Sequence, residues 1–318
     1  MDNIIWLSEV TSNDLDIVGN KAFKLSELYN LRLPIPQGFI LTNDTFKKFL
    51  ENNRLDKKIN SISENIDINN FKLLNSKIDE IKEIMMKAEF SENLKNEIFE
   101  AYDNLNVDEQ VWRNSNKKAL DLVRIGRSLP YLAVKLSSNQ KELSTFLNVK
   151  GISSLITVIK KSWASLYNLE NIYTRVKNNI SNEEINGAIL IQKMINSNKS
   201  GFIVNNLEDN EITIQALYGL SELLTTKSVL PNFYTVDLLK LEIKDKTLNS
   251  QPYYLTIGDY GNNVRKENKE NTQVLNDNEI LDLASLYKRV KDYYNKNIKV
   301  EFAVENSRIS IINVKGNI

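Results

Sequence analysis

Histidine and cysteine are both absent from this chain of 318 residues, so its chemically active side chains are carboxylates, lysines, arginines, hydroxyls and amides. Without cysteine there is no thiolate nucleophile, no disulfide and no cysteine-ligated zinc site. Without histidine there is no imidazole base, no Ser-His-Asp triad, no histidine-ligated metal and no phosphohistidine. Any reaction must therefore use carboxylates, ammonium and guanidinium groups, and backbone hydrogen bonds.

Glycine-rich phosphate loops are also absent. The chain has ten glycines, no two closer than Gly258 and Gly261, and neither GxGxxG nor GxxxxGK[ST] occurs. Those spacings are needed for backbone N–H groups to surround a phosphate in a Rossmann fold or a P-loop. The sequence therefore excludes both of these nucleotide cradles.

The charges balance, with 41 Lys and Arg residues against 41 Asp and Glu residues. A neutral chain offers no electrostatic attraction to nucleic acid or to an acidic membrane surface. No apolar run approaches the 18 residues of a membrane span, and the N-terminus lacks the basic and apolar parts of a signal peptide. We expect a cytoplasmic protein that binds neither nucleic acid nor membrane.

Hydrophobic periodicity predicts helices mostly in the first part of the chain and strands mostly in the second. The helices are expected over 20–32, 43–52, 71–102 (two helices divided near Phe90), 115–126, 151–167 and 280–294, the last opened by a capping box at Asn276–Glu279, with a loop over 53–70. The strands are expected over 38–42, 131–135, 188–195, 201–205, 211–216, 233–236, 253–257, 298–304 and 308–314. This order predicts an α+β fold of two lobes, 1–186 with a helical insertion and 187–318.

A series of short motifs, in order, gives the chain a family resemblance. They are Val18–Leu25, Leu33–Phe39, Ala119–Arg127, Leu132–Ser138, Thr145–Gly151, Trp163–Tyr167, Ile172–Arg175, Ile191–Ile195, Tyr218–Tyr234, Val300–Ala303 and Ile309–Lys315. Over residues 6–316 the chain resembles the N-terminal ATP-binding domain shared by phosphoenolpyruvate synthase, pyruvate phosphate dikinase and rifampicin phosphotransferase. The resemblance implies an ATP-grasp-like fold with ATP between two lobes, and ATP and Mg²⁺ as cofactors.

In the full enzymes of that family, the domain phosphorylates a histidine on a separate swivelling domain. Because this chain has no histidine, the resemblance implies a partner: a separate protein carrying a phosphorylatable histidine domain and a pyruvate-binding barrel.

The resemblance also implies roles for individual residues. Lys21 occupies the position of the lysine that contacts the triphosphate, and Glu301 that of the glutamate that binds Mg²⁺. The hinge that packs on adenine and bonds it through backbone groups is matched by Gln192, Lys193, Met194 and Ile195. Taken alone, Lys21 and Glu301 are also typical of a solvated lysine at a helix start and a solvent-facing carboxylate on a strand.

Four positions depart from the family pattern. Lys135 and Lys315 replace two arginines, the second of them catalytic, and lysine keeps the charge without the planar fork that clamps phosphate. Asn313 replaces a glutamine at the metal, which leaves a carbonyl oxygen on a shorter side chain. At Ser221, just before Glu222, a serine replaces a glycine of the family motif.

The connection from Ser138 to Thr145 is the largest departure, because the family has a longer loop there whose backbone donors cover the phosphates. Preorganised donors of this kind contribute on the order of 3 kcal/mol each to a transition state. Three hypotheses therefore stay open: an ATP-dependent phosphotransferase domain, a catalytically impaired nucleotide-binding or regulatory protein of the same fold, and a helical adaptor unrelated to ATP.

Overall fold

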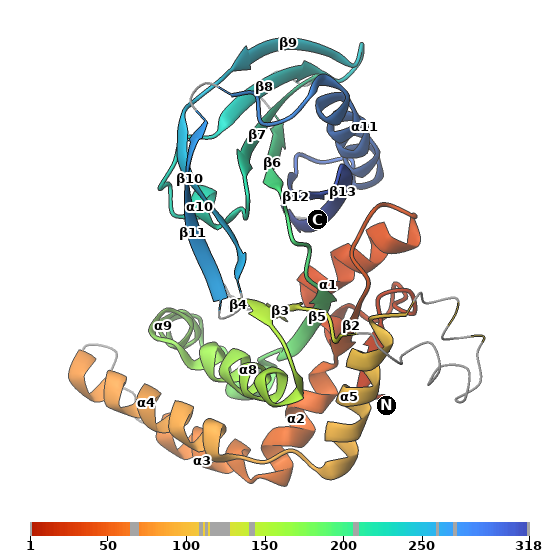
Figure 1. Cartoon of the computed structure of the whole chain (residues 1–318). Helices are drawn as coiled ribbons and strands as arrows, with labels where there is room; N and C mark the ends of the chain where they lie inside the picture. The colour runs from red at the N-terminus through yellow and green to blue at the C-terminus, as the bar shows by residue number, and fades with distance from the viewer. Residues whose placement is uncertain are drawn as a thin grey trace. The chain divides into compact units, whose positions relative to one another are not determined.

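The computed structural model in Figure 1 describes residues 2–63, 70–107, 111, 114, 128–139, 144–205, 210–258, 261–269 and 272–316. Contacts within the chain divide it into two compact units. The first consists of Met1–Glu27 and Gln37–Met194, and the second of Leu28–Pro36 and Ile195–Ile318. The expected boundary at 186/187 precedes strand β5 (Ala188–Lys193), whereas this division follows it.

The first unit is built on a five-stranded antiparallel sheet in the order β1-β2-β5-β3-β4. Besides β5, its strands are β1 (Ile4–Trp6), β2 (Gly38–Leu41), β3 (Leu132–Ser137) and β4 (Thr145–Val149). All six residues of β3 and the first five of β5 are buried. Continuous burial along these central strands indicates packing on both faces of the sheet.

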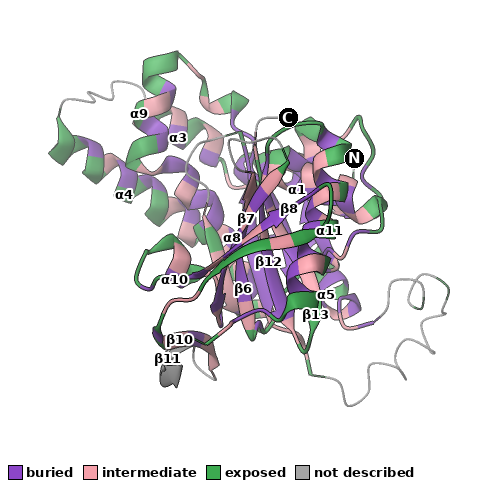
Figure 2. Ribbon diagram, turned by 90° about the horizontal axis from the view of Figure 1, so that it is seen from above, coloured by how far each residue is buried: buried purple, intermediate pink, exposed green. Residues whose placement is uncertain are grey.

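One face of this sheet is covered by most of the helices of the unit (Figure 1). They are α2 (Asn43–Asn52), α3 (Leu55–Ser63), α4 (Phe71–Lys87), α5 (Glu92–Asn104), α8 (Ile152–Ala164) and α9 (Leu169–Asn178), with the 3-10 turns η1 (Ser165–Tyr167) and η2 (Asn182–Glu184). Trp163 is at the centre of their core, with its ring 4.8 Å from that of Phe49 and 5.6 Å from that of Phe90. Figure 2 shows the buried stripe along α4 that faces this core.

Side-chain caps explain where several of these helices begin. Thr42, Asn70, Ser91 and Asn168 each precede a helix and accept a hydrogen bond from a backbone N–H in its first turn. Such a cap satisfies a donor that has no partner inside the helix.

One expected loop is wrong in part. Residues 53–70 were expected to be a loop because they are polar and rich in asparagine, yet α3 spans Leu55–Ser63. Leu55 and Ile59, four residues apart, are 3% and 1% exposed, so two apolar contacts with the core hold the helix. Residues 64–69 and the expected helix over 115–126 lie outside the described residues.

The second unit contains a six-stranded antiparallel sheet in the order β13-β12-β6-β7-β8-β9. Its strands are β6 (Lys199–Asn205), β7 (Glu211–Tyr218), β8 (Asn232–Asp237), β9 (Glu242–Thr247), β12 (Lys299–Glu305) and β13 (Arg308–Lys315). The unit also has a hairpin, β10 (Gln251–Gly258) with β11 (Gly261–Lys269), and the short helix α10 (Glu222–Thr225).

Helix α11 (Asp277–Tyr294) packs against this sheet. The expected capping box is confirmed: the Asn276 side chain accepts from the backbone N–H of Glu279, and the Asn276 N–H donates to the Glu279 carboxylate. An ion pair of 2.7 Å between Glu279 and Lys199 then ties the helix start to β6. The α+β class, with helices mostly early and strands mostly late, is therefore confirmed.

Candidate functional site

Gly19 sets the position of Lys21 in the first unit. Inside α1 (Leu15–Asn30) the backbone leaves helical geometry at Gly19, with φ 72° and ψ 162°. A Cβ at Gly19 would lie 2.0 Å from the carbonyl oxygen of Ser137 in β3, so only glycine permits this approach. The helix restarts after the break, and the backbone N–H of Ala22 donates to the Ser137 hydroxyl at 2.9 Å. Lys21, half-buried, thus lies in a first helical turn anchored to the end of β3.

Lys135 points across the sheet toward β5. Its ammonium donates to the side-chain oxygen of Gln192 at 3.0 Å, and the two residues are only 7% and 1% exposed. Gly38 pairs with Gln192 in register, and a Cβ at Gly38 would lie 2.7 Å from Gln192 Cγ. The missing side chain at Gly38 therefore leaves the room that the Gln192 side chain occupies.

The segment after Gln192 is held by backbone hydrogen bonds. The N–H of Lys193 donates to the Gln37 carbonyl at 3.0 Å, and the N–H of Met194 donates to the Tyr131 carbonyl at 2.8 Å. The Met194 sulfur in turn accepts from the backbone N–H of Asn148 at 3.0 Å. Ile195 is the next residue and the first of this stretch in the second unit.

In the second unit, Glu301 and Asn313 are direct partners across β12 and β13. The Glu301 carboxylate accepts from the Ser221 hydroxyl at 2.7 Å through one oxygen and from Asn313 Nδ2 at 3.3 Å through the other. With its amide nitrogen turned to Glu301, Asn313 leaves Oδ1 buried and without a hydrogen-bond partner among the described residues. A buried polar atom without a partner is costly unless a ligand satisfies it.

Two lysines face each other next to this pair. Lys299 lies opposite Lys315 in the register, and its ammonium is 3.7 Å from the centre of the Phe202 ring. Burial first, and then the nearby charge of Lys315, lowers the pKa of Lys299, while Glu301 opposes this shift. Lys315 itself is exposed.

The structure brings the expected residues together in two sets. Lys135 contacts Gln192 in the first unit, and Glu301 contacts Asn313 in the second. Ser221 and Lys299 complete the second set and were not expected as site residues. Lys299 could have been found from its position two residues before Glu301, because alternate residues of a strand share a face.

The second set contains two side chains whose oxygens suit Mg²⁺, the carboxylate of Glu301 and the amide of Asn313. Among the described residues, no three carboxylates lie close enough together to hold a metal ion by themselves. One carboxylate and one amide oxygen nevertheless suit Mg²⁺, which proteins usually bind through one or two carboxylates together with substrate phosphates and waters. The buried, unpartnered oxygen of Asn313 thus fits a hard cation.

Comparison with known proteins identifies relatives over nearly the whole chain. Residues 15–315 match the family model described as pyruvate phosphate dikinase, AMP/ATP-binding domain. A probable phosphoenolpyruvate synthase of Archaeoglobus fulgidus is 32% identical over 97% of this chain and 41% of its own length. One from Methanocaldococcus jannaschii is 30% identical over 99% of this chain and 26% of its own. The chain thus spans less than half the length of these relatives.

Among solved structures, a D-alanine–D-alanine ligase from Helicobacter pylori matches 63% of this chain and 46% of its own, with 14% identity and a TM-score of 0.28. Separately, none of the helices formed by the described residues is long and apolar enough to span a membrane.

Proposed function

This chain belongs to the family of pyruvate phosphate dikinase AMP/ATP-binding domains, and on that premise we propose that it binds ATP together with Mg²⁺. The observation that carries the metal part of the proposal is the Glu301–Asn313 pair with its buried, unpartnered amide oxygen. Glu301 and Asn313 would hold the ion, and Ser221 would fix the carboxylate through its hydroxyl. A bound Mg²⁺ supplies charge that neutralises phosphate oxygens.

The nucleotide would be held by residues of the first unit and by Ile195, the residue that follows it in the chain. Lys21 would contact the triphosphate as a point charge, next to backbone N–H groups of a first helical turn. Gln192, Lys193, Met194 and Ile195 would contact adenine. Support for this assignment is the position of Lys21 directly after the Gly19 break and the rigid attachment of Lys193 and Met194 to neighbouring strands.

The phosphoryl acceptor would be a histidine outside this sequence, because the sequence contains none. The acceptor is proposed from the family resemblance, as is a separate protein that carries both the histidine domain and a pyruvate-binding barrel. Lys315, exposed at the end of β13, would neutralise charge during transfer in place of arginine.

A second candidate, nucleotide binding without efficient transfer, is favoured by one observation. Lys135 replaces a phosphate-clamping arginine, and its ammonium is buried against the neutral amide of Gln192. This hydrogen bond gives the two buried side chains a partner inside the sheet. It also holds the ammonium group on Gln192, where it neutralises a bound phosphate less effectively. In this alternative the protein acts as a regulatory or partner subunit.

Calorimetric titration tests the binding proposal. The chain is titrated with ATP in the presence of Mg²⁺, with ATP in the presence of a chelator, and with AMP. We expect binding of ATP that is tighter with Mg²⁺, and we expect Glu301→Gln to remove most of the Mg²⁺ effect. Glu305→Gln, at the far end of the same strand, is the matched control. No binding of ATP with Mg²⁺, or an unchanged Mg²⁺ effect in Glu301→Gln, would overturn the proposal.

A further inference from the structure

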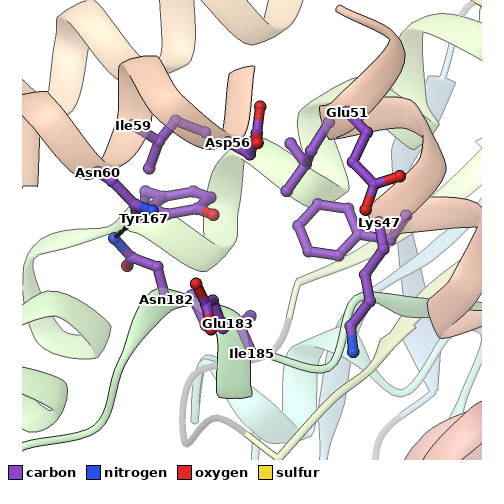
Figure 3. Close-up of a pocket in the computed structure, with 11 residues that line it drawn as sticks. Lys47, Glu51, Asp56, Ile59, Asn60, Tyr167, Asn182, Glu183 and Ile185 are labelled. Carbon is purple, nitrogen blue, oxygen red and sulfur yellow. Dashed lines mark hydrogen bonds between the residues drawn. The ribbon is translucent and has the colours of Figure 1, made fainter. Parts of the chain in front are cut away.

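A cavity of about 300 Å³ lies in the first unit among α2, α3 and the turns η1 and η2 (Figure 3). None of the residues that line it belongs to the proposed nucleotide site. Phe46, Leu50, Ile59 and Ile185, all buried, give it apolar walls. Its volume is at the lower end of the range for small-molecule sites in proteins.

Tyr167 supplies a polar group inside this apolar space. Its side chain is 1% exposed, and Figure 3 shows the hydroxyl directed into the cavity. No hydrogen bond to this hydroxyl is formed within the described part of the chain. Buried tyrosine hydroxyls usually have a partner, so this one is available to a ligand.

The mouth of the cavity is acidic. Glu51, Asp56 and Glu183 contribute three carboxylates and Lys47 one ammonium, and none of these four groups forms an ion pair with a described residue. The mouth therefore carries a net charge of −2. Two asparagines also lie at the mouth, where Asn182 Nδ2 donates a hydrogen bond to Asn60 Oδ1 at 2.9 Å. This hydrogen bond makes both side chains less available to a ligand.

One further cation is near the cavity without lining it. The Arg175 guanidinium is 5.2 Å from the centre of the Tyr167 ring and donates to the Leu166 carbonyl at 2.8 Å. Both partners are neutral, so Arg175 keeps its positive charge, and this charge disfavours a second cation beside the Tyr167 ring. A cationic group of a ligand is therefore favoured at the carboxylates of the mouth rather than at the inner end.

We propose that this cavity is a binding site for a small organic cation, with an aromatic or aliphatic body against the apolar walls and a protonated amine at the acidic mouth. The Tyr167 hydroxyl provides a hydrogen bond at the inner end. Shape and apolar walls supply the affinity, and the three carboxylates supply the preference for positive charge.

Three matched probes test the site, each with a phenol that can form a hydrogen bond with Tyr167 at the inner end: the amine tyramine, its neutral alcohol analogue 4-(2-hydroxyethyl)phenol, and the anion 4-hydroxyphenylacetate. Each is titrated into the isotope-labelled full chain, and binding is followed from amide chemical shifts. We expect the amine to bind most tightly, the alcohol more weakly and the anion not at all, with shifts mapping to α2, α3 and residues 165–185. Binding of the alcohol or the anion as tight as that of the amine would overturn the proposal, as would no amine binding up to about 10 mM.

Variants assign the contacts. Tyr167→Phe keeps the buried ring and removes only the hydroxyl, so amine affinity should fall about threefold to tenfold. Asp56→Asn should weaken the amine at least as much and leave the alcohol unchanged. Glu100→Gln, an exposed carboxylate of α5 outside the cavity, is the control and should change neither. An unchanged affinity in both Tyr167→Phe and Asp56→Asn would place the amine elsewhere and contradict the assignment.

Discussion

The buried oxygen of Asn313 distinguishes a metal-binding pair from an ordinary cross-strand contact. Asn313→Ala removes that oxygen, and Ser221→Ala removes the hydroxyl that orients Glu301. If Mg²⁺ binds here, each change should weaken Mg²⁺-dependent ATP binding about tenfold, a usual effect for a group that holds a metal ligand in place. Ser310→Ala, on the same strand as Asn313, is the control. Calorimetry at several Mg²⁺ concentrations measures the effect, and an unchanged Mg²⁺ dependence in both variants would contradict the assignment.

The two lysines of the first unit should differ in their effect on nucleotide affinity. Lys21 follows the Gly19 break in a first helical turn, whereas Lys135 donates to Gln192 inside the sheet. Lys21→Ala should therefore cost roughly 1.5–3 kcal/mol of ATP binding, the value of a charge-assisted contact, and Lys135→Ala clearly less. Lys177→Ala, on exposed α9, serves as control. Equal losses for the two lysines, or a larger loss for Lys135→Ala, would show that Lys135 reaches the phosphates.

At the scale of residues, the contacts between site candidates depend on how separate chain segments pair, which the sequence alone does not specify. Glu301 and Asn313 lie on two strands joined by a short turn, and the register that starts at this turn runs from Glu305–Arg308 to Phe302–Ile311. Continued unchanged, it would pair Glu301 with Ile312, so a register shift beside Glu301, which the turn does not predict, makes Asn313 its partner. Ser221 is 80 residues from Glu301 in the chain, and no local pattern could place its hydroxyl on that carboxylate. The same limit applies to Lys135 and Gln192, whose contact depends on how β3 and β5 pair.

At the scale of elements, the break in α1 depends on a close approach between chain segments. Gly19→Ala would bring a Cβ against the Ser137 carbonyl in a backbone conformation that alanine adopts poorly, so we expect destabilisation of at least about 2 kcal/mol. Gly151 has φ of 86° but nothing within 4 Å of the Cβ position. Gly151→Ala therefore carries only the backbone strain and should cost about half as much. Urea unfolding compares the two, and equal costs would mean that the close approach is relieved by a small shift.

Helix α11 contains a buried tyrosine, Tyr287, that should make the second unit less stable at alkaline pH. Burial raises the pKa of Tyr287 to about 12, and the protonated hydroxyl donates to the Ile298 carbonyl at 2.9 Å. A raised pKa contributes stability that is complete below the ordinary tyrosine value near 10 and is lost as the pH rises to about 12. The corresponding free energy is about 2–3 kcal/mol.

Tyr287→Phe should remove that part of the pH dependence. The variant is expected to be about 1 kcal/mol less stable near neutral pH, from the lost hydrogen bond, and to lose less stability than the parent between about pH 10 and 12. Urea unfolding followed by circular dichroism measures both effects. Tyr173→Phe, 46% exposed on α9, is the matched control. If the free energy of unfolding falls equally between about pH 10 and 12 in the parent and in Tyr287→Phe, another group controls the alkaline transition.

Elements with a strong apolar pattern could be predicted from the sequence. Elements that form mainly through contacts with other parts of the chain could not. The run 188–195 predicts a buried strand, and β5 occupies most of it. Strand β9, Glu242–Thr247, is largely exposed and highly charged, and it forms because β8 offers it an edge to pair with. Helix α3 was missed because Leu55 and Ile59, which face the core, are separated by polar and charged residues and flanked by asparagine-rich segments.

At the scale of the molecule, the family match confirms the expected family of AMP/ATP-binding domains, and the helices and strands of the two units confirm the expected α+β class. The order of the motifs carried this prediction, because each motif alone is short. Activity is less predictable than fold. By the family resemblance, Lys135, Lys315 and the short connection 139–144 would replace three phosphate-facing elements, and we expect their effects to combine at the transition state rather than in the folded ground state.

Turnover with an added acceptor is the decisive measurement for the whole molecule. The chain is incubated with labelled ATP, Mg²⁺ and the isolated histidine domain of a full-length relative, and label on the histidine is followed in time. If each of the three altered elements costs about 2 kcal/mol of transition-state stabilisation, transfer is slowed on the order of 10⁴-fold. We therefore expect labelling near background even though ATP binds. Lys135→Arg combined with Lys315→Arg should raise the rate, because the planar guanidinium restores bidentate contact with phosphate. Labelling by the unaltered chain as fast as by an intact relative would show that two lysines and a short connection suffice for phosphoryl transfer.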